Sequence, residues 1–311
     1  MTKKIRLVFI GTGSAAPFNL KRMPCIALKY LHDLLIFDIG ECCQYGLLEK
    51  RLKPVKSNLV ILITHFHADH VAGIPTFLHT LKMSNRQKEI IIVGPSGLRQ
   101  FITGIFSIYQ LEKVPFPVKL LEVNSINNRT KIIESENYEI FAFPTKHHIP
   151  SIGYIFKEKD RKLFDEKKAE LLGIPRTKVR KHLLDGKEIR LEDGRLIKPE
   201  DVIKGVKKGV AIGYTGDTKF FPDLIKFLEG VDILISEATY LEKTKKAEAE
   251  ERFHLTAKQA ASIAKEIKAK KLILTHISSR YKDLTVILDE AKSISGKFNI
   301  IIPNDGDELY L

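Results

Sequence analysis

Short runs of aliphatic and β-branched residues recur along the whole chain and constrain its fold more than any other feature. The runs are IRLVFI (5–10), LLIFDI (34–39), LVILIT (59–64), EIIIV (89–93), YEIFAF (138–143), GVAIGYT (209–215), DILIS (232–236), LILTHI (272–277) and NIIIP (299–303). Several are apolar throughout, which is typical of strands covered on both faces. Helical patterns lie between some of them, at 98–111 and at 256–268, and Thr256 and Gln259 have the spacing of a capping box. The pattern predicts an α/β protein with two sheets layered between helices.

The size and composition are those of a globular chain. With 311 residues, 44% of them hydrophobic, the chain can bury a large core, and we expect a single domain over residues 1–311. No run approaches the roughly 18 apolar residues of a membrane span, and the apolar stretch at 5–10 is too short for a signal peptide. We therefore expect no membrane partner and a cytoplasmic location.

The cysteines give no sign of a structural framework. Cys25, Cys42 and Cys43 are the three in the chain, and they do not form a CxxC or Cys/His pattern. Neither a disulfide network nor a thiolate zinc site is indicated by this spacing. We expect three buried or inert thiols.

The charge balance favours an anionic partner. Lys and Arg number 51 against 38 Asp and Glu, which gives a net charge of +13 and a pI near 9.4. Such an excess is typical of proteins that bind nucleic acid or another polyanionic surface. The alternative is that abundant Lys and Glu only solvate the surface, as in many heat-adapted proteins, and composition does not decide between the two.

One segment departs from the strand-rich pattern. Residues 157–208 hold 17 Lys and Arg and 11 Asp and Glu, with many turn residues. This predicts a basic insertion arm that projects from the main body. Its centre is a cluster of four cations that could contact several phosphates: Arg176, Lys178, Arg180 and Lys181. A solvated helical face is the alternative for such a charge run.

The motif HxHxDH follows directly after the apolar run 59–64. Its side chains are His65, His67, Asp69 and His70. Strand ends of this kind commonly carry ligands in layered α/β folds, and alternate positions project in similar directions. His65 and His67 could thus reach one divalent metal ion while Asp69 and His70 turn toward a second. Asp69 is then placed to act as general base on a metal-bound water.

Two metal ions need further ligands from elsewhere in the chain. Suitable side chains stand at the ends of later apolar runs: His147, Asp217 and His276. Asp217 follows Gly216 at a turn, which suits a carboxylate that bridges two cations. His148 competes with His147, and spacing alone does not choose between them.

A glycine-rich segment near the N-terminus is similar to a dinucleotide fingerprint. Gly11, Gly13 and Ala16 follow an apolar run with the GxGxxA spacing. Pro17 and Pro24 argue against the helix that must follow in such a site. We therefore expect no nucleotide cofactor.

The motifs together resemble a known family. Besides HxHxDH, the elements that carry the resemblance are GTGSAAP (11–17), DIGE (38–41), TGDT (215–218), EAT (237–239), HLT (254–256) and LTHISSRY (274–281). HxHxDH specifies the metallo-β-lactamase superfamily, and the remaining elements are similar to the tRNase Z family of tRNA 3′-processing endoribonucleases. The resemblance runs from residue 5 to about residue 281.

The resemblance implies a fold and a ligand set. The fold is a four-layer αβ/βα sandwich of two mixed β-sheets with helices outside. The family's ligand histidine lies six residues before a Gly-Tyr pair, which makes His147 the ligand here because Gly153 and Tyr154 follow at that spacing. One metal ion is then held by His65, His67 and His147, the other by Asp69, His70 and His276, with Asp217 bridging them. The implied cofactors are two Zn²⁺ per subunit, with Mn²⁺ or another divalent ion as alternatives.

The resemblance also implies roles around the metals and for the arm. Asp38 orients a ligand histidine, and Glu237 with His254 forms a proton shuttle toward the leaving oxygen. The family's HEAT and HST boxes read SEAT and HLT here, so the roles of the family's first His and of its Ser do not carry over. The basic arm corresponds in position to a tRNA-binding arm, and the family forms homodimers. The implied substrate is precursor tRNA.

Three functions follow as hypotheses. The first is a zinc-dependent endoribonuclease that removes the 3′ trailer from precursor tRNA near the discriminator base, leaving a 3′-hydroxyl on the tRNA and a 5′-phosphate on the trailer. The second is a hydrolase of small esters, thioesters or phosphodiesters on the same fold. The third, a non-catalytic RNA-binding protein, is disfavoured because every expected ligand residue is present.

Overall fold

The computed structural model describes residues 5–16, 21–294 and 298–311. Pro17 of the glycine-rich segment lies outside these residues. The chain forms two compact units. The first contains the described residues of Met1–Glu134, Ile140–Phe156 and Ala211–Leu311, and the second contains Ser135–Glu139 and Lys157–Val210.

Two large sheets form the first unit, and each has seven strands within the described residues. The order of the first sheet is β18-β1-β2-β3-β4-β5-β6, antiparallel from β18 to β3 and parallel from β3 to β6. Its strands are β1 (Ile5–Gly11), β2 (Cys25–Tyr30), β3 (Asp33–Phe37), β4 (Asn58–Leu62), β5 (Ile90–Pro95), β6 (Val118–Val123) and β18 (Glu308–Tyr310).

The second sheet has the order β17-β16-β15-β14-β9-β8-β7, and its strands β14 to β17 are parallel. Its strands are β7 (Thr130–Glu134), β8 (Tyr138–Pro144), β9 (Ile152–Glu158), β14 (Ala211–Tyr214), β15 (Ile233–Glu237), β16 (Lys271–Thr275) and β17 (Asn299–Ile301). Because the carboxyl ends of neighbouring parallel strands meet at one edge, the residues that follow β14, β15 and β16 lie near one another.

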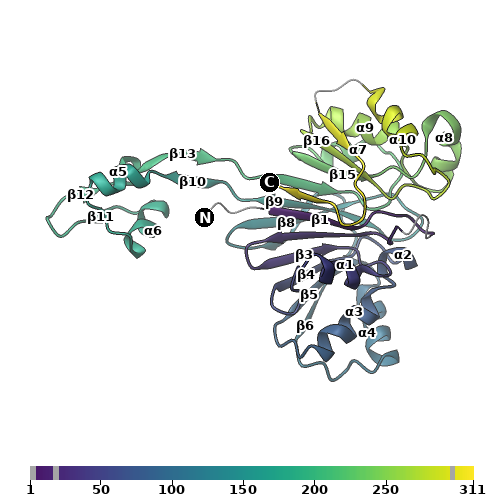
Figure 1. The fold of residues 1–311 in the computed structure, drawn as a ribbon, viewed down its shortest axis with the longest axis horizontal. Coiled ribbons are helices and arrows are strands. Elements are labelled where there is room, and N and C mark those ends of the chain that lie inside the picture. The colour runs from purple at the N-terminus through teal and green to yellow at the C-terminus, as the bar shows by residue number, and fades with distance from the viewer. Residues whose placement is uncertain (1–4, 17–20, 295–297) are drawn as a thin grey trace. The chain divides into compact units, whose positions relative to one another are not determined.

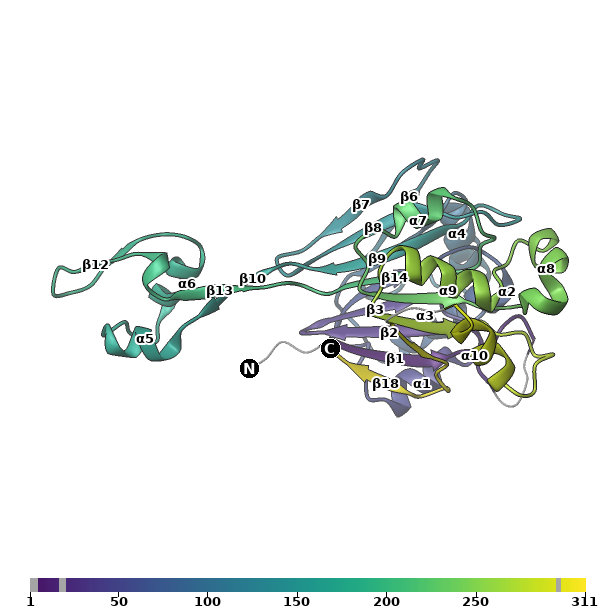
Figure 2. The same cartoon turned by 90° about the horizontal axis from the view of Figure 1, so that it is seen from above.

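Helices cover the outer face of each sheet, so that the first unit has four layers (Figures 1 and 2). The first sheet is covered by α1 (Cys43–Glu49), α3 (Ile74–Met83) and α4 (Leu98–Ile108), and the second by α7 (Asp223–Phe227), α9 (Ala257–Glu266) and α10 (Thr285–Lys292). Two further helices are α2 (Ala68–Val71) and α8 (Glu242–Glu251). The expected fold class, an α/β sandwich of two mixed sheets with helices outside, is confirmed.

Aromatic rings join the inner faces of the two sheets. The ring of Phe37 lies 5.6 Å from that of Tyr214 and 6.3 Å from that of Tyr154, and the ring of Tyr30 lies 5.8 Å from that of Phe156 (centroid distances). All five side chains are buried. Such edge-on and tilted pairs add specific packing to the burial of apolar area, and they fix the separation of the two sheets whose edges carry the candidate ligands.

The apolar runs predict the strands well. Each of the runs overlaps a strand, and the helices predicted at 98–111 and 256–268 are α4 and α9. The buried strands β2 and β9 lie outside the runs. The capping box is confirmed, because Thr256 Oγ1 accepts a hydrogen bond from the Gln259 amide at 3.1 Å and Gln259 Oε1 accepts one from the Thr256 amide at 3.0 Å. Strands β6 and β7 lack a clear apolar run because both are only partly buried and contain charged residues.

The structure also bears on the glycine-rich segment and on the cysteines. Between Gly11 and Cys42 the described residues form no helix, as the prolines led us to expect. The expectation of three buried or inert thiols is wrong for two of them, because Cys25 and Cys43 form a disulfide, whereas Cys42 is a free, exposed thiol. The pairing depends on the packing of β2 against the start of α1, which brings the two Cα atoms to 6.0 Å and which sequence spacing does not reveal.

The second unit contains the segment predicted as an insertion, 157–208, and has a small core of its own. Its elements are β10 (Arg161–Phe164), α5 (Glu166–Leu171), α6 (Lys178–Leu184), β11 (Ile189–Arg190), β12 (Leu196–Ile197), a 3₁₀ turn (Pro199–Asp201) and β13 (Ile203–Lys207). Strands β10 and β13 pair antiparallel, as do β11 and β12. Among the described residues of both units, no helix is long and apolar enough to cross a membrane.

Candidate metal centre

The predicted ligand residues stand at strand ends of both sheets and converge on one site in the first unit. The HxHxDH motif follows β4, with Asp69 and His70 in the short helix α2. His147 follows β8, Asp217 follows β14 and His276 follows β16. Within the described residues, four overlapping groups bring their potential ligand atoms within 4.8 Å of one another. The groups are His65 with His67 and His147, His65 with His70 and Asp217, Asp69 with His70 and His276, and Asp217 with His254 and His276.

The first half of the site is a triangle of imidazole nitrogens. His67 Nδ1 lies 3.1 Å from His65 Nε2 and 3.1 Å from His147 Nε2. Nitrogens bound at 2.0–2.1 Å to a tetrahedral zinc ion would be roughly 3.3 Å apart. Burial lowers the pKa of each of these three histidines, so their imidazoles are neutral and keep a lone pair for a metal ion.

The second half of the site mixes carboxylates with imidazoles. Asp69 Oδ2 lies 3.3 Å from His276 Nε2 and 3.5 Å from His70 Nε2. Asp217 Oδ2 lies 3.4 Å from the Nε2 atoms of both His70 and His276, and 3.9 Å from His65 Nε2. Asp217 is therefore the one carboxylate of these groups that approaches ligand residues of both halves.

In four of the histidines the Nδ1 atom has a polar partner outside the candidate metal site. This contact orients the ring so that its Nε2 atom faces the site. His70 Nδ1 donates to Asp38 Oδ2 at 2.8 Å, and His147 Nδ1 donates to the Phe253 carbonyl at 3.1 Å. The Nδ1 atoms of His65 and His276 lie 3.0 and 2.9 Å from threonine hydroxyls. Metal-ligating histidines almost always have such a partner, which fixes the tautomer and the orientation of the ring.

Two buried atoms at the centre lack a hydrogen-bond partner. Among the described residues, His70 Nε2 and Asp217 Oδ1 are buried side-chain atoms without one. An unpaired buried polar group is costly. Burial opposes a proton on His70, but the charges of Asp217 and Asp38 outweigh it and raise the pKa of His70 well above its usual value. A site that attracts a proton so strongly would also attract a cation, so these residues fit divalent metal ions.

Asp38 lies at the base of the site, where it is the centre of several hydrogen bonds. Besides the bond from His70, Asp38 accepts hydrogen bonds from the Thr64 amide at 2.8 Å and from the Tyr214 hydroxyl at 2.9 Å. Asp38 and His276 both have left-handed backbone angles, with φ of 57° and 53°. Non-glycine residues in this region are typical of sites where the surrounding structure holds strain.

Gly216 keeps the Asp217 turn close to the histidine motif. Its φ is +58°, and a Cβ atom at this position would lie 2.7 Å from Thr64 Cγ2. A side chain here would both strain the turn and push Asp217 away from the strand end that carries His65. The TGDT motif therefore has a glycine for steric reasons.

A hydrogen-bonded pair of His254 and Glu237 lies beside the metal ligands. His254 Nδ1 lies 3.0 and 3.1 Å from the two carboxylate oxygens of Glu237, and 3.9 Å from Asp217 Oδ2. Burial disfavours a charged His254, but the Glu237 carboxylate outweighs it and raises the pKa of His254 to about 9. Glu237 is fixed by the Thr218 amide at 2.7 Å and the Thr239 hydroxyl at 2.6 Å. The pair can hold a proton at the edge of the site.

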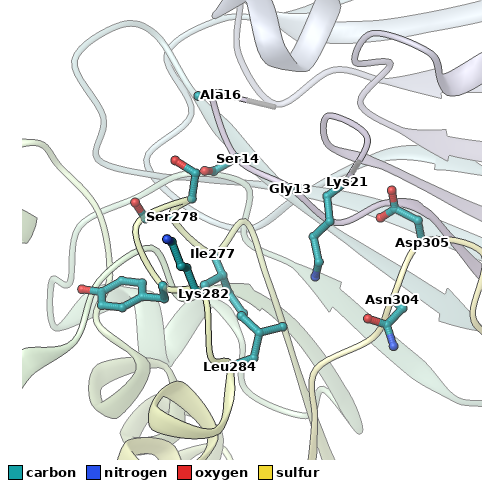
Figure 3. A pocket seen from close by; sticks show the side chains of 12 residues that line it. Gly13, Ser14, Ala16, Lys21, Ile277, Ser278, Lys282, Leu284, Asn304 and Asp305 are labelled. Carbon is teal, nitrogen blue, oxygen red and sulfur yellow. The ribbon is translucent and has the colours of Figure 1, made fainter. Parts of the chain in front are cut away.

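A pocket of about 360 Å³ with a mixed polar and apolar lining adjoins the site on the side of His276. Ile277 and Ser278, which line it, follow His276 directly, and the His276 amide donates to the Thr12 carbonyl at 3.2 Å. Lys21 and Lys282 enter the pocket from different segments of the chain (Figure 3). Burial lowers the pKa of Lys21. Asp305 lines the same pocket, so one carboxylate partly balances the two ammonium groups, and the remaining positive charge suits a negatively charged group.

Several side chains that hold the site together had no predicted role. Tyr214 and Thr64 support Asp38, and Thr239 contacts Glu237, His254 and His276. Thr239 could have been recognised because it belongs to the EAT motif. Tyr214 could not, because it lies inside an apolar run that predicts only a strand. His148, the alternative to His147, is exposed and takes part in none of the four ligand groups.

The four cations of the predicted arm lie in the second unit and differ in their contacts. Arg180 is held by Glu166, by the carbonyls of Ile174 and Pro175 and by the face of the Phe164 ring. Arg176 pairs with Glu170, and Lys181 lies 3.9 Å from Glu136. Lys178 and Lys181 are exposed on α6. Arg180 is thus engaged within its own unit, whereas the two lysines present their charges to solvent.

Comparisons with known proteins identify relatives of this chain. Residues 202–277 match the profile of the β-lactamase superfamily domain, and residues 5–165 match that of the anti-Pycsar protein Apyc1. The chain is 39% identical over 306 residues to the ribonuclease Z of Methanocaldococcus jannaschii, covering 97% of this chain and 95% of that protein. It is 38% identical over 291 residues to the ribonuclease Z of Nitrosopumilus maritimus, covering 93% of this chain and 95% of that protein.

Solved structures agree on the fold. The short form of human tRNase Z has a TM-score of 0.69 and 24% identity, with 98% of each chain covered. A long-form RNase Z from yeast has a TM-score of 0.66 and 16% identity, covering 99% of this chain and 42% of that one. The fold and the His/Asp cluster define a metal-dependent hydrolase of the metallo-β-lactamase class. Its nearly full-length relatives place the chain within the ribonuclease Z family of endoribonucleases, to which it belongs.

Proposed function

We propose that this protein is a zinc-dependent endoribonuclease that removes the 3′ trailer from precursor tRNA in the cytoplasm. Cleavage near the discriminator base would leave a 3′-hydroxyl on the tRNA and a 5′-phosphate on the trailer. The convergence of all seven predicted ligand residues on one site, in a chain of the ribonuclease Z family, carries this proposal. The pocket with Lys21 and Lys282 beside the site supports a phosphate-containing substrate.

The ligand residues divide into two sets. His65, His67 and His147 would hold one Zn²⁺, and Asp69, His70 and His276 would hold the other, with Asp217 shared between them. Two such cations, when bound, lower the pKa of a water molecule and neutralise charge on phosphoryl oxygens.

The remaining chemistry belongs to side chains of this chain. Asp69 would accept the proton of the attacking water, which approaches the phosphorus in line with the leaving 3′-oxygen. His254 would donate a proton to that oxygen, and Glu237 would hold His254 in position through the two short contacts described above. Asp38 would keep His70 oriented through its 2.8 Å hydrogen bond.

The second unit would supply affinity for the folded tRNA. Phosphate contacts position a nucleic acid without reading its sequence, and Arg176, Lys178, Arg180 and Lys181 form a cation cluster suited to them. Because Arg180 is engaged internally, we expect it to contribute less than the two exposed lysines. By resemblance to tRNase Z, we also propose a homodimer in which the arm of one protomer serves its partner.

Loss of the exposed arm lysines is expected to weaken tRNA binding. The double variant Lys178→Ala/Lys181→Ala should raise the Kd for precursor tRNA about tenfold and lower the salt slope of log K by about two, because two phosphate contacts disappear. The measurement is a binding titration at several salt concentrations. As control, Lys204→Ala/Lys207→Ala removes the same charge from exposed positions of the same unit. An unchanged slope in the first variant would rule out this role for the arm.

Incubation of the metal-loaded protein with a 3′-extended precursor tRNA tests the proposed function as a whole. Release of the trailer that stops on addition of a chelator supports it. A precursor that stays intact with Zn²⁺ or Mn²⁺ supplied would contradict it.

A further inference from the structure

His148 has an unusual position for a residue without a role. It directly follows the ligand His147, and the two ring centroids are 5.7 Å apart. Its side chain is exposed, and it belongs to none of the metal-binding groups. The exposed ring therefore lies at the surface directly beside a proposed metal ligand.

The ring of His148 is packed against a second aromatic ring. Its centroid lies 4.4 Å from that of Phe253. Phe253 is itself fixed, because its carbonyl accepts the hydrogen bond from His147 Nδ1 at 3.1 Å and the Lys219 ammonium lies 4.1 Å from its ring centroid. The φ of Phe253 is 56°, a left-handed value for a non-glycine residue. These contacts hold His148 in place before any ligand arrives.

A cavity of about 470 Å³ opens beside His147 and His148. Its lining consists of prolines, aliphatic side chains, hydroxyl groups and the two histidines, and no Asp, Glu, Lys or Arg is among them. Ser96, Ser125 and Ser151 supply hydroxyl groups. This chemistry differs from that of the pocket with Lys21 and Lys282 on the other side of the site. An uncharged lining with hydroxyl groups and a flat ring suits a nucleobase rather than a phosphate.

We propose that His148 is a base-stacking residue, and that the adjoining cavity receives the base of one of the two nucleotides that flank the scissile phosphate. The proposal rests on the proposed function, since it names how that site holds its RNA. Single-stranded RNA is commonly held by bases stacked on aromatic side chains, including histidine. A ring already immobilised by Phe253 loses little further freedom when a base stacks on it.

Cleavage kinetics can test whether His148 and a flanking base act through the same contact. His148→Ala is expected to raise KM for precursor tRNA about tenfold, with kcat and bound metal little changed. His148→Phe should restore KM, because it keeps a stacking face without an imidazole. His79→Ala is the control, since His79 is an exposed histidine on α3. An abasic nucleotide on one side of the cleavage position should raise the KM of the wild type by the same factor as the His148→Ala substitution. The same abasic substrate should cause no further increase in the KM of His148→Ala.

A fluorescence experiment reports the stacking itself rather than the cleavage rate. RNA oligonucleotides that carry 2-aminopurine on either side of the cleavage position are titrated with metal-loaded protein. Stacking on His148 predicts fluorescence quenching at one of the two positions, lost in His148→Ala and retained in His148→Phe. Quenching without cleavage would leave the base site standing and reject the proposed function. Equal quenching in wild type and His148→Ala, or additive effects of His148→Ala and of abasic substitution at both positions, would overturn the proposal.

Discussion

Replacement of Asp69 by Ala is expected to reduce the single-turnover rate of precursor tRNA cleavage by about a thousandfold or more. Asp69 Oδ2 lies within 3.5 Å of both His276 Nε2 and His70 Nε2, so under the proposed mechanism the variant would lose a metal ligand and the proton acceptor at once. The affinity for tRNA should be kept, because phosphate contacts away from the site supply most of it. Rates and Kd values are measured on the same preparations, together with bound metal.

The control for this variant is Glu112→Ala, which removes one carboxylate from an exposed position. It should cleave like the wild type. Two outcomes would contradict the assignment of Asp69: cleavage within tenfold of the wild-type rate, or loss of tRNA binding in parallel with loss of activity. The second outcome would also indicate that Asp69 acts on the structure of the site rather than on the reaction.

Replacement of His254 by Ala is expected to lower kcat by about 10²- to 10⁴-fold, the range of general acid catalysis. The reason is the contact of His254 with Glu237, which raises the pKa of His254 to about 9 against the opposing effect of burial, and the place of His254 3.9 Å from Asp217. Glu237→Gln should cause a smaller loss in the same direction. It removes the charge but keeps a side chain of similar size next to His254.

A substrate with sulfur in place of the leaving 3′-oxygen tests the role of His254 directly. A thiolate leaves without protonation, so this substrate should restore much of the rate of His254→Ala and little of that of Asp69→Ala. Equal rates of His254→Ala on the oxygen and the sulfur substrate would show that His254 does not protonate the leaving group. Unchanged metal content in His254→Ala separates this role from a structural one.

Much of the fold follows from local sequence, because most buried strands of the two sheets overlap an apolar run. The buried strands β2 and β9 are exceptions that the runs did not predict. The half-buried strands β6 and β7 do not overlap a run either, since charged residues interrupt them. The metal ligands were recognisable because their residue types are rarely clustered at strand ends without a function. The His147 and His148 alternatives were equivalent by spacing, and the resemblance chose His147, the one whose Nε2 faces His67 in the structure.

What the sequence could not supply are contacts between distant segments. The hydrogen bond from Tyr214 to Asp38 joins residues 176 positions apart, and Thr239 contacts His276 from the segment that follows the neighbouring strand β15. The disulfide between Cys25 and Cys43 depends in the same way on packing. The engagement of Arg180 within the second unit depends on the positions of α5 and Phe164. Each of these contacts is set by tertiary structure, and none has a local pattern.

The measurement that tests the central claim most directly is the mapping of both product ends after incubation with a 3′-extended precursor tRNA, with and without chelator. The account predicts metal-dependent cleavage next to the discriminator base, with a 3′-hydroxyl on the tRNA and a 5′-phosphate on the trailer. Intact precursor in the presence of Zn²⁺ or Mn²⁺, together with rapid turnover of a small ester or phosphodiester, would contradict the account and assign the same centre to a small-molecule hydrolase.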